Sequence, residues 1–280
     1  EALRVVARAA SRALAVDGDR VFFGDAGTDA LLAAPRGGGE PFVFGRRAPL
    51  DIALTPLDVV WIGSPGDVVL AAPRSGGAPR VLRDRGIFPA IAARGSDVFV
   101  LEASGAGGSL LRITGATAGH LADLDAAPRD LVVDDDHAYV LTAATVLQVP
   151  VPRGNPVLLA RGRDFAHAAM DGGYVYATAD RGATARTLVR IAKKGGAVTV
   201  LEHAVRDAPI AVHGPDVYFF DADQPMLRRV PRAGGASTIV ARLEPLARVT
   251  ALAIDASRIY VASADGQVLS MEVPAPVAAR

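Results

Sequence analysis

Short apolar stretches alternate with turn residues along the whole chain. Typical stretches are residues 131–133 and 217–220, which have the length of a β-strand. Glycine, proline and aspartate separate them, and these residues favour turns. No stretch approaches the roughly 18 to 20 apolar residues that a membrane-spanning helix needs. The pattern therefore predicts an all-β protein without a membrane span.

The same order of apolar and turn residues returns seven times. The clearest copy runs from Ala13-Leu-Ala-Val-Asp17 through Arg20-Val-Phe-Phe-Gly-Asp25 to Leu31-Leu-Ala-Ala-Pro-Arg-Gly-Gly-Gly39. One apolar residue of the second predicted strand indexes the copies: Val21, Val59, Val98, Ala138, Val175, Val217 and Ile259. The intervals are 38, 39, 40, 37, 42 and 42 residues, so seven units of about 40 residues fill the 280-residue chain.

Each unit contains four short predicted strands, which together predict a single seven-bladed β-propeller with four-stranded blades. We expect the propeller to span residues 1–274 and residues 275–280 to form a C-terminal tail. Blade repeats are expected to begin near residues 13, 51, 90, 130, 167, 209 and 251.

The two ends of the chain predict how the ring closes. The last unit ends after its third strand and lacks a fourth. Residues 2–9 resemble fourth strands such as residues 80–83, and Val5 lies eight residues before Ala13, as Leu82 lies eight before Ala90. We therefore expect the N-terminal strand to complete the last blade.

Two further features of the repeat predict packing and solvation. The second strand carries an aromatic residue in six of seven copies, and such rings are expected to fill the space between neighbouring sheets: Phe22, Phe99, Tyr139, Tyr176, Tyr218 and Tyr260. The third strand ends in turns such as Pro-Arg-Gly-Gly. We expect the basic residues of these turns to lie on a solvated outer rim.

The repeat resembles those of predicted secreted bacterial propellers and is loosely similar to the YWTD-type propeller repeat. The likeness rests on the segment from Ala15 to Asp25 and on the Pro-Arg-Gly-Gly-Gly turn that follows. Only Asp25 and Asp221 keep the acidic residue at its place in the YWTD pattern. YWTD propellers usually have six blades, so the resemblance implies the fold and does not transfer that family's receptor function.

Composition excludes several classes of function. The chain has 30 basic and 30 acidic residues, and this balance argues against a nucleic-acid partner. Cysteine is absent, which excludes disulfides, thiolate metal sites and cysteine nucleophiles, and is compatible with an oxidising compartment. We expect a monomer in an extracytoplasmic location, either periplasmic or secreted.

Acidic residues gather in the loops that join second and third strands. In a propeller these loops share a face with the blade-to-blade connections, where ligands are usually bound. The loops contain Asp25, Asp29, Asp67, Glu102, Asp180, Asp221, Asp223 and Asp265, with Arg181 and Arg186 as the basic residues. We take Asp25 and Asp221 as candidate ligand-binding residues and expect an acidic face that binds a protein or peptide partner. The alternative is that these aspartates form Asx turns.

Three polar residues stand where first strands begin, at the predicted mouth of the central channel. They are Asp51, Asp130 and His167. Two carboxylates and an imidazole suit a divalent cation such as Ca²⁺, so these residues are candidate ligand-binding and metal-binding groups. The alternative is that they are hydrogen-bonded caps of the strands.

Two functions follow from these observations. The first is a non-catalytic ligand- or protein-binding module of the bacterial cell envelope. The second is a metal-dependent hydrolase or lyase that uses Asp51, Asp130 and His167 at the channel mouth. No nucleophile elbow, His-Glu-x-x-His pair or phosphate loop occurs in the sequence. The sequence therefore favours the first function and leaves an enzymatic role open.

Overall fold

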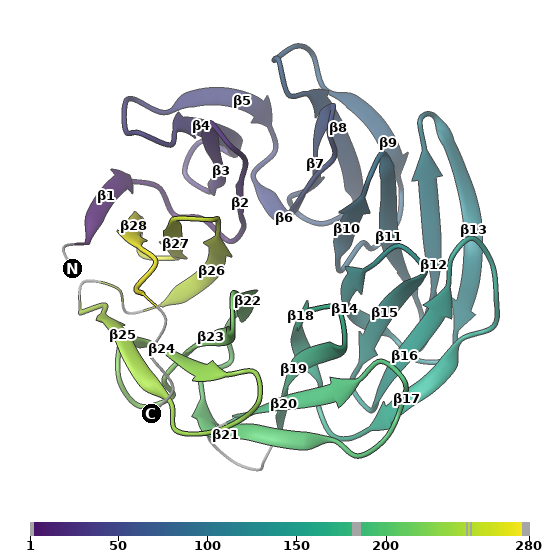
Figure 1. Ribbon diagram of the computed structural model, residues 1–280. Helices are drawn as coiled ribbons and strands as arrows, with labels where there is room; N and C mark the ends of the chain where they lie inside the picture. Colours follow the sequence, from purple (N-terminus) through teal and green to yellow (C-terminus); the bar gives the residue numbers. More distant parts are fainter. Residues whose placement is uncertain (1–2, 181–185, 245, 247, 276–280) are drawn as a thin grey trace.

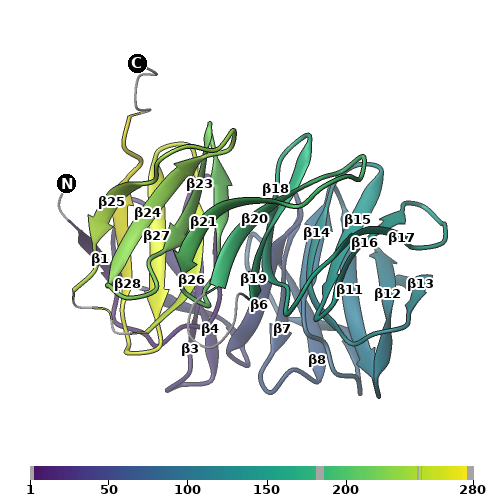
Figure 2. The ribbon, with the colours of Figure 1, turned by 90° about the horizontal axis from the view of Figure 1, so that it is seen from below.

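The computed structural model describes residues 3–180, 186–244, 246 and 248–275. Within them, seven four-stranded antiparallel sheets form a ring, and the first strand of each sheet lies innermost (Figure 1). Figure 2 shows the ring from the side, with the strands of each blade running between its two faces. The predicted seven-bladed propeller is confirmed. The described residues include no helix long and apolar enough to cross a membrane.

The first three blades follow the N-terminal strand. Blade 1 consists of β2 (Leu14–Val16), β3 (Arg20–Asp25), β4 (Ala30–Pro35) and β5 (Phe42–Arg46). Blade 2 consists of β6 (Pro49–Leu54), β7 (Asp58–Gly63), β8 (Val68–Pro73) and β9 (Arg80–Asp84). Blade 3 consists of β10 (Ile91–Arg94), β11 (Asp97–Ser104), β12 (Gly107–Thr114) and β13 (Thr117–Leu124).

Four more blades complete the ring. Blade 4 consists of β14 (Pro128–Val133), β15 (His137–Thr142), β16 (Thr145–Pro150) and β17 (Val157–Arg161). Blade 5 consists of β18 (Ala166–Met170), β19 (Tyr174–Asp180), β20 (Arg186–Ala192) and β21 (Thr199–Val205). Blade 6 consists of β22 (Ala211–His213), β23 (Asp216–Phe220), β24 (Met226–Pro231) and β25 (Thr238–Arg242). Blade 7 consists of β26 (Val249–Ile254), β27 (Arg258–Ser263), β28 (Val268–Glu272) and β1 (Arg4–Ala7).

Blade 7 combines the last three strands of the chain with the N-terminal strand, as the sequence predicted. Strand β1 pairs with β28, where Arg4 stands opposite Ser270 and Val5 opposite Leu269. The pairing covers the open edge of β28, whose backbone groups would otherwise be free to pair with another chain. Of the expected tail, residues 276–280 lie outside the described residues. The carbonyl oxygens of Pro274 and Ala275 accept hydrogen bonds from Arg229.

Because neighbouring strands run in opposite directions, each face of the ring gathers its own set of links. We call the connection face the one that carries the blade-to-blade connections and the loops between second and third strands. The turn face carries the turns between first and second strands and between third and fourth strands. The chain enters every first strand from the connection face.

The aromatic column of the second strands lies between the sheets. All six rings are at most 2% exposed. In blade 2 the column holds Val60, and Trp61 beside it is fully buried and donates its indole N–H to the carbonyl oxygen of Arg47 at 3.1 Å. These side chains belong to the apolar clusters that join neighbouring sheets, so the repeat period fixes both the blades and the core between them.

The basic residues at the ends of the third strands are arranged differently from the prediction. Four of them form ion pairs with an aspartate in the first turn of the preceding blade: Arg36–Asp255, Arg74–Asp17, Lys193–Asp134 and Arg232–Asp171. The expectation of a purely solvated rim is wrong at these positions, because the side chains connect neighbouring blades. Arg153 stays exposed, since the equivalent position of the preceding turn, in blade 3, holds Arg94 in place of an aspartate.

Candidate functional site

A cavity of about 400 Å³ opens at the centre of the connection face, where the first strands begin. Residues from all seven blades line it, so it is the mouth of the central channel. Asp51, Asp130 and His167 all lie in its lining, as do Arg12 and Arg129. A larger cavity of about 590 Å³ lies on the turn face between blades 6 and 7 and contains none of the candidate residues.

Asp51 joins blade 2 to blade 3. Its Oδ1 accepts the N–H of Ile52 at 2.8 Å, and its Oδ2 accepts the N–H of Ile91, in the next blade, at 2.9 Å. Burial raises the pKa of Asp51 to about 7, with a further contribution from the charge of Asp130, although the two N–H groups act in the opposite direction. Both carboxylate oxygens are therefore used in holding two blades together.

Asp130 makes the same contacts two blades further on. Its Oδ1 accepts the N–H of Leu131 at 2.7 Å, and its Oδ2 accepts the N–H of Ala168, in blade 5, at 2.6 Å. Burial raises the pKa of Asp130, while its two N–H partners and the charge of His167 oppose that rise. The hydrogen bonds match the strand caps that the sequence left as the alternative to a metal site.

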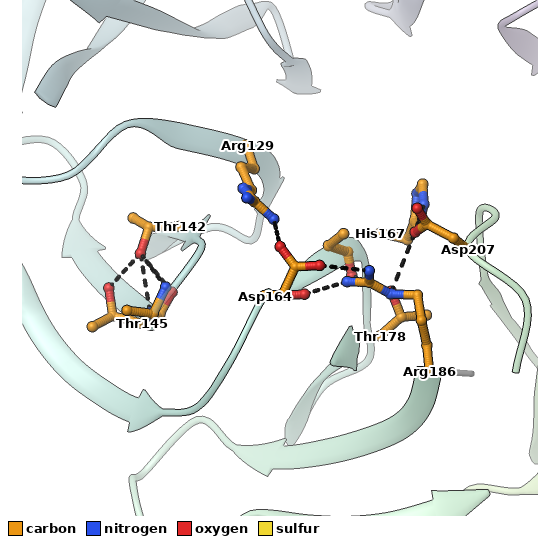
Figure 3. Close-up of polar contacts among 10 residues, drawn as sticks. Arg129, Thr142, Thr145, Asp164, His167, Thr178, Arg186 and Asp207 are labelled. Atoms are coloured by element: carbon orange, nitrogen blue, oxygen red, sulfur yellow. Dashed lines mark hydrogen bonds and ion pairs between the residues drawn. The ribbon is translucent and has the colours of Figure 1, made fainter. Parts of the chain in front are cut away.

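His167 belongs to a charged network on the connection face (Figure 3). Its backbone has a φ of 50°, and its Nε2 lies 3.0 Å from Oδ1 of Asp207. Arg186 contacts Asp207 at 3.3 Å and Asp164 at 2.8 Å, and Asp164 also pairs with Arg129. The network thus runs across blades 4, 5 and 6.

The network lowers the pKa of its two carboxyl groups. Hydrogen bonds from Arg129 and Arg186 hold the pKa of Asp164 below its usual value. The hydrogen bond with His167 does so for Asp207, where the charge of Arg186 adds to the effect and burial opposes it. Both aspartates are therefore held in the charged form that the arginines require.

The three candidate metal ligands share one cavity without forming a coordination site. Among the described residues, no group of three or more histidine, aspartate or glutamate side chains is arranged to hold a metal ion. Asp51 and Asp130 direct both oxygens at backbone N–H groups, and His167 directs Nε2 at Asp207.

Asp25 and Asp221, the candidates in the loops, close their own turns. Asp25 accepts the N–H of Gly27 at 3.0 Å and the hydroxyl of Thr28 at 2.6 Å. Asp221 accepts two N–H groups of its own loop and a hydrogen bond from Arg228 at 2.9 Å. Burial alone would raise the pKa of Asp221, but these hydrogen bonds lower it. Both side chains therefore follow the Asx-turn alternative.

The prediction that the connection face is acidic is wrong. Arginine side chains neutralise loop carboxylates there, as in Arg47–Asp67 and Arg83–Glu102, both at 3.0 Å. An arginine occurs in the connection before blades 1, 2, 3, 5, 6 and 7 and directly after the start of blade 4: Arg12, Arg47, Arg85, Arg163, Arg206, Arg248 and Arg129. Sequence reasoning missed them because it considered only the loops between second and third strands. Arg181, one of the two basic residues expected in those loops, lies outside the described residues.

Solved structures share the fold. Virginiamycin B lyase from Staphylococcus aureus superposes with a TM-score of 0.78 at 10% sequence identity, over 98% of this chain and 99% of that one. PorZ, a bacterial surface component of the type-IX secretion system of Porphyromonas gingivalis, gives a TM-score of 0.67 at 13% identity, over 99% of this chain and 39% of that one. A structure of the nidogen–laminin complex gives a TM-score of 0.53 at 16% identity, over 81% of this chain and 77% of that one.

No family model matches the sequence, and no curated protein matches it. At identities of 10 to 16%, the structural likenesses show the fold alone. The resemblance to propeller repeats that the sequence indicated is thereby confirmed as a likeness of fold.

Proposed function

We propose that this chain is a non-catalytic binding module of the bacterial cell envelope that takes a ligand or protein partner on its connection face. One observation carries the proposal. The acids at the channel mouth, Asp51 and Asp130, have both oxygens hydrogen-bonded to the backbones of two blades. A carboxylate held in this way joins two blades and stabilises the ring, which favours a structural role over proton transfer to a substrate.

Two of the similar propellers support the location and the mode of action. PorZ is described as a bacterial surface component, and nidogen is seen in complex with laminin. By analogy, we place this chain outside the cytoplasm and assign it a protein partner. The mixed charge of the connection face suits a partner that itself presents both acidic and basic groups.

Capture of partners from an envelope extract of the source organism tests the proposal with a matched pair of variants. Arg163→Glu reverses an exposed charge on the connection face, and Arg153→Glu reverses one on the turn face of the adjoining blade. A captured protein is then purified and its affinity for each variant measured by calorimetry. We expect Arg163→Glu to weaken binding and Arg153→Glu to leave it unchanged. The opposite ranking would refute the choice of face.

The second candidate, a metal-dependent hydrolase or lyase at the channel mouth, keeps one observation in its favour, because a pKa of about 7 at Asp51 is typical of an acid–base residue. Thermal melting with and without Ca²⁺, Zn²⁺ and Mn²⁺ separates the two functions. A metal-dependent rise in melting temperature that disappears in Asp51→Asn would replace the binding proposal with the enzymatic one. We expect no such rise.

A further inference from the structure

Every blade directs one equivalent backbone N–H into the channel mouth, from its first strand or, in blade 6, from the residue just before that strand. In an antiparallel pair, hydrogen-bonded and non-hydrogen-bonded positions alternate. In blade 1 the N–H of Asp17 donates to the carbonyl of Arg20, so Asp17 and Arg20 form a hydrogen-bonded pair. By alternation, Ala15–Phe22 is the next hydrogen-bonded pair, and Leu14–Phe23 is a non-hydrogen-bonded pair. The N–H of Leu14 therefore points away from β3. The equivalent residues of the seven blades are Leu14, Ile52, Ile91, Leu131, Ala168, Ile210 and Leu252.

Two aspartates satisfy four of these seven N–H groups. Asp51 bridges Ile52 and Ile91 at 2.8 and 2.9 Å, and Asp130 bridges Leu131 and Ala168 at 2.7 and 2.6 Å. In each case one planar carboxylate spans the same N–H of two adjacent blades. The distance between neighbouring blades at the channel mouth is therefore one that a single carboxylate fits.

The other three N–H groups belong to Ile210, Leu252 and Leu14, in blades 6, 7 and 1, which are consecutive around the ring. We call them the uncapped sector. The residues that correspond to Asp51 in these blades are Pro209, Ala251 and Ala13, which have no side-chain acceptor. Within the part of the chain that the structure describes, no side chain or non-ladder carbonyl accepts from these three N–H groups.

The surroundings of the uncapped sector favour a negative group. Ile210, Leu252 and Leu14 line the same cavity of about 400 Å³ as Arg12. The side chain of Arg12 is exposed and forms no ion pair among the described residues. Backbone N–H groups that converge beside an arginine make an anion-binding concavity, and the cavity is large enough for a small ligand.

We infer that the uncapped sector binds a carboxylate group of a ligand, which takes between blades 7 and 1 the place that Asp51 and Asp130 take between other blades. The inference rests on the proposed binding function and names the chemistry of its ligand. The carboxylate comes from a small organic acid or from the C-terminus of a peptide. Arg12 supplies a positive charge beside it.

One substitution converts the uncapped sector into a capped one. Ala251→Asp places a carboxylate at the position of Asp51 in blade 7, within reach of the N–H groups of Leu252 and Leu14. We expect this variant to melt at a higher temperature and to lose carboxylate binding. Ala90→Asp is the matched control, because the N–H groups of Ile91 and Leu131 already have acceptors. It should bind the carboxylate and gain no stability.

Binding is measured by calorimetry and ligand-observed NMR with acetate, benzoate, their amides, and trialanine with a free or an amidated C-terminus. We expect the acids to bind at least about tenfold more tightly than the amides, since a charged acceptor makes the stronger hydrogen bonds. Preference for benzoate identifies a small acid as the ligand, and preference for free trialanine identifies a peptide end. Arg12→Gln, at an exposed position, should weaken binding about tenfold without loss of folding.

Equal binding of acids and amides, or undiminished binding to Ala251→Asp, would overturn the inference. Failure of every carboxylate to bind the wild-type chain would overturn it as well. None of these three results would affect the capture experiment with Arg163→Glu, so the binding function and the identity of its ligand group are tested separately.

Discussion

Asp134 offers the sharpest test of how the blades are held together on the turn face. Its Oδ1 accepts the N–H of His137 at 2.8 Å and closes the first turn of blade 4. Its Oδ2 accepts the hydroxyl of Tyr139 at 2.9 Å and the ammonium of Lys193, in blade 5, at 2.7 Å. The Lys193 side chain is only 10% exposed and that of Asp134 is 27% exposed. Asp134→Asn therefore leaves a nearly buried lysine without a charged partner.

The cost follows from the loss of the two hydrogen bonds that Oδ2 accepts, from Tyr139 and Lys193. Removing one member of a buried ion pair costs about 3–5 kcal/mol, and the partial exposure of Asp134 reduces this to about 2–3 kcal/mol of unfolding free energy. The turn itself survives, because the asparagine carbonyl still accepts the N–H of His137. Asp135→Asn is the matched control. Asp135 pairs with Arg94 at 2.6 Å, but its side chain is 74% exposed, so we expect no measurable change.

Urea denaturation of both variants at pH 7, with Lys193→Met to complete a double-mutant cycle, measures the coupling. Burial alone would raise the pKa of Asp134, but the hydrogen bonds from Lys193, His137 and Tyr139 lower it. The stabilisation is therefore complete above the unfolded-state pKa of about 4 and is lost as the pH falls through the folded-state value. Equal effects of Asp134→Asn and Asp135→Asn, or strict additivity in the cycle, would refute the reasoning.

Three further predictions concern the channel mouth, the core and the closure of the ring. Because the pKa of Asp51 is raised from 3.8 to about 7, the folded state binds its proton more tightly than the unfolded state; stability should fall by up to about 4 kcal/mol between pH 4 and pH 7. Urea denaturation at several pH values in that range measures the change of unfolding free energy with pH. This change should disappear in Asp51→Asn, and its persistence would assign it to another group. Gly45→Ala should lower the unfolding free energy by about 1–3 kcal/mol, because its Cβ would lie 2.9 Å from the buried ring of Trp61; Gly18→Ala, with open space around its Cβ, is the control in the same assay. A chain without residues 1–8 should melt at a lower temperature and aggregate, since β28 loses its partner; calorimetry and light scattering that match the full chain would contradict the closure by β1.

The architecture was predictable because a fixed period leaves few alternatives. The column from Val21 to Ile259 places the second strand of every blade, and the packing of rings such as Tyr139 and Tyr176 follows from its position in each repeat. The closure of blade 7 followed from the eight-residue interval between Val5 and Ala13. Each of these inferences needs only local spacing, and the structure repeats the same local geometry seven times.

The electrostatics were not predictable in the same way, because they depend on which residues face each other across blades. Lys193 meets Asp134 across 59 residues of sequence, and Arg36 meets Asp255 across 219 residues. Aligning repeats identifies equivalent positions within a blade but does not tell which positions of adjacent blades touch. The count of acidic loop residues therefore predicted an acidic face, while the arginines that neutralise it, such as Arg47 and Arg83, lie in other parts of the repeat.

Blades that lack an aspartate in the Asp51 column depart from the repeat at the channel mouth. Such departures indicate where selection for binding, in place of folding, can act. Every blade has one channel-facing N–H at the same position, and a single aspartate accepts hydrogen bonds from the N–H groups of two blades. Four aspartates would therefore suffice for the whole ring, and the chain has two at this column, at Asp51 and Asp130. A repeat shaped by stability alone would place a third at Ala251, between blades 7 and 1, where instead three adjacent N–H groups and Arg12 stand around one cavity. A ligand carboxylate that supplies the missing acceptor would account for that departure.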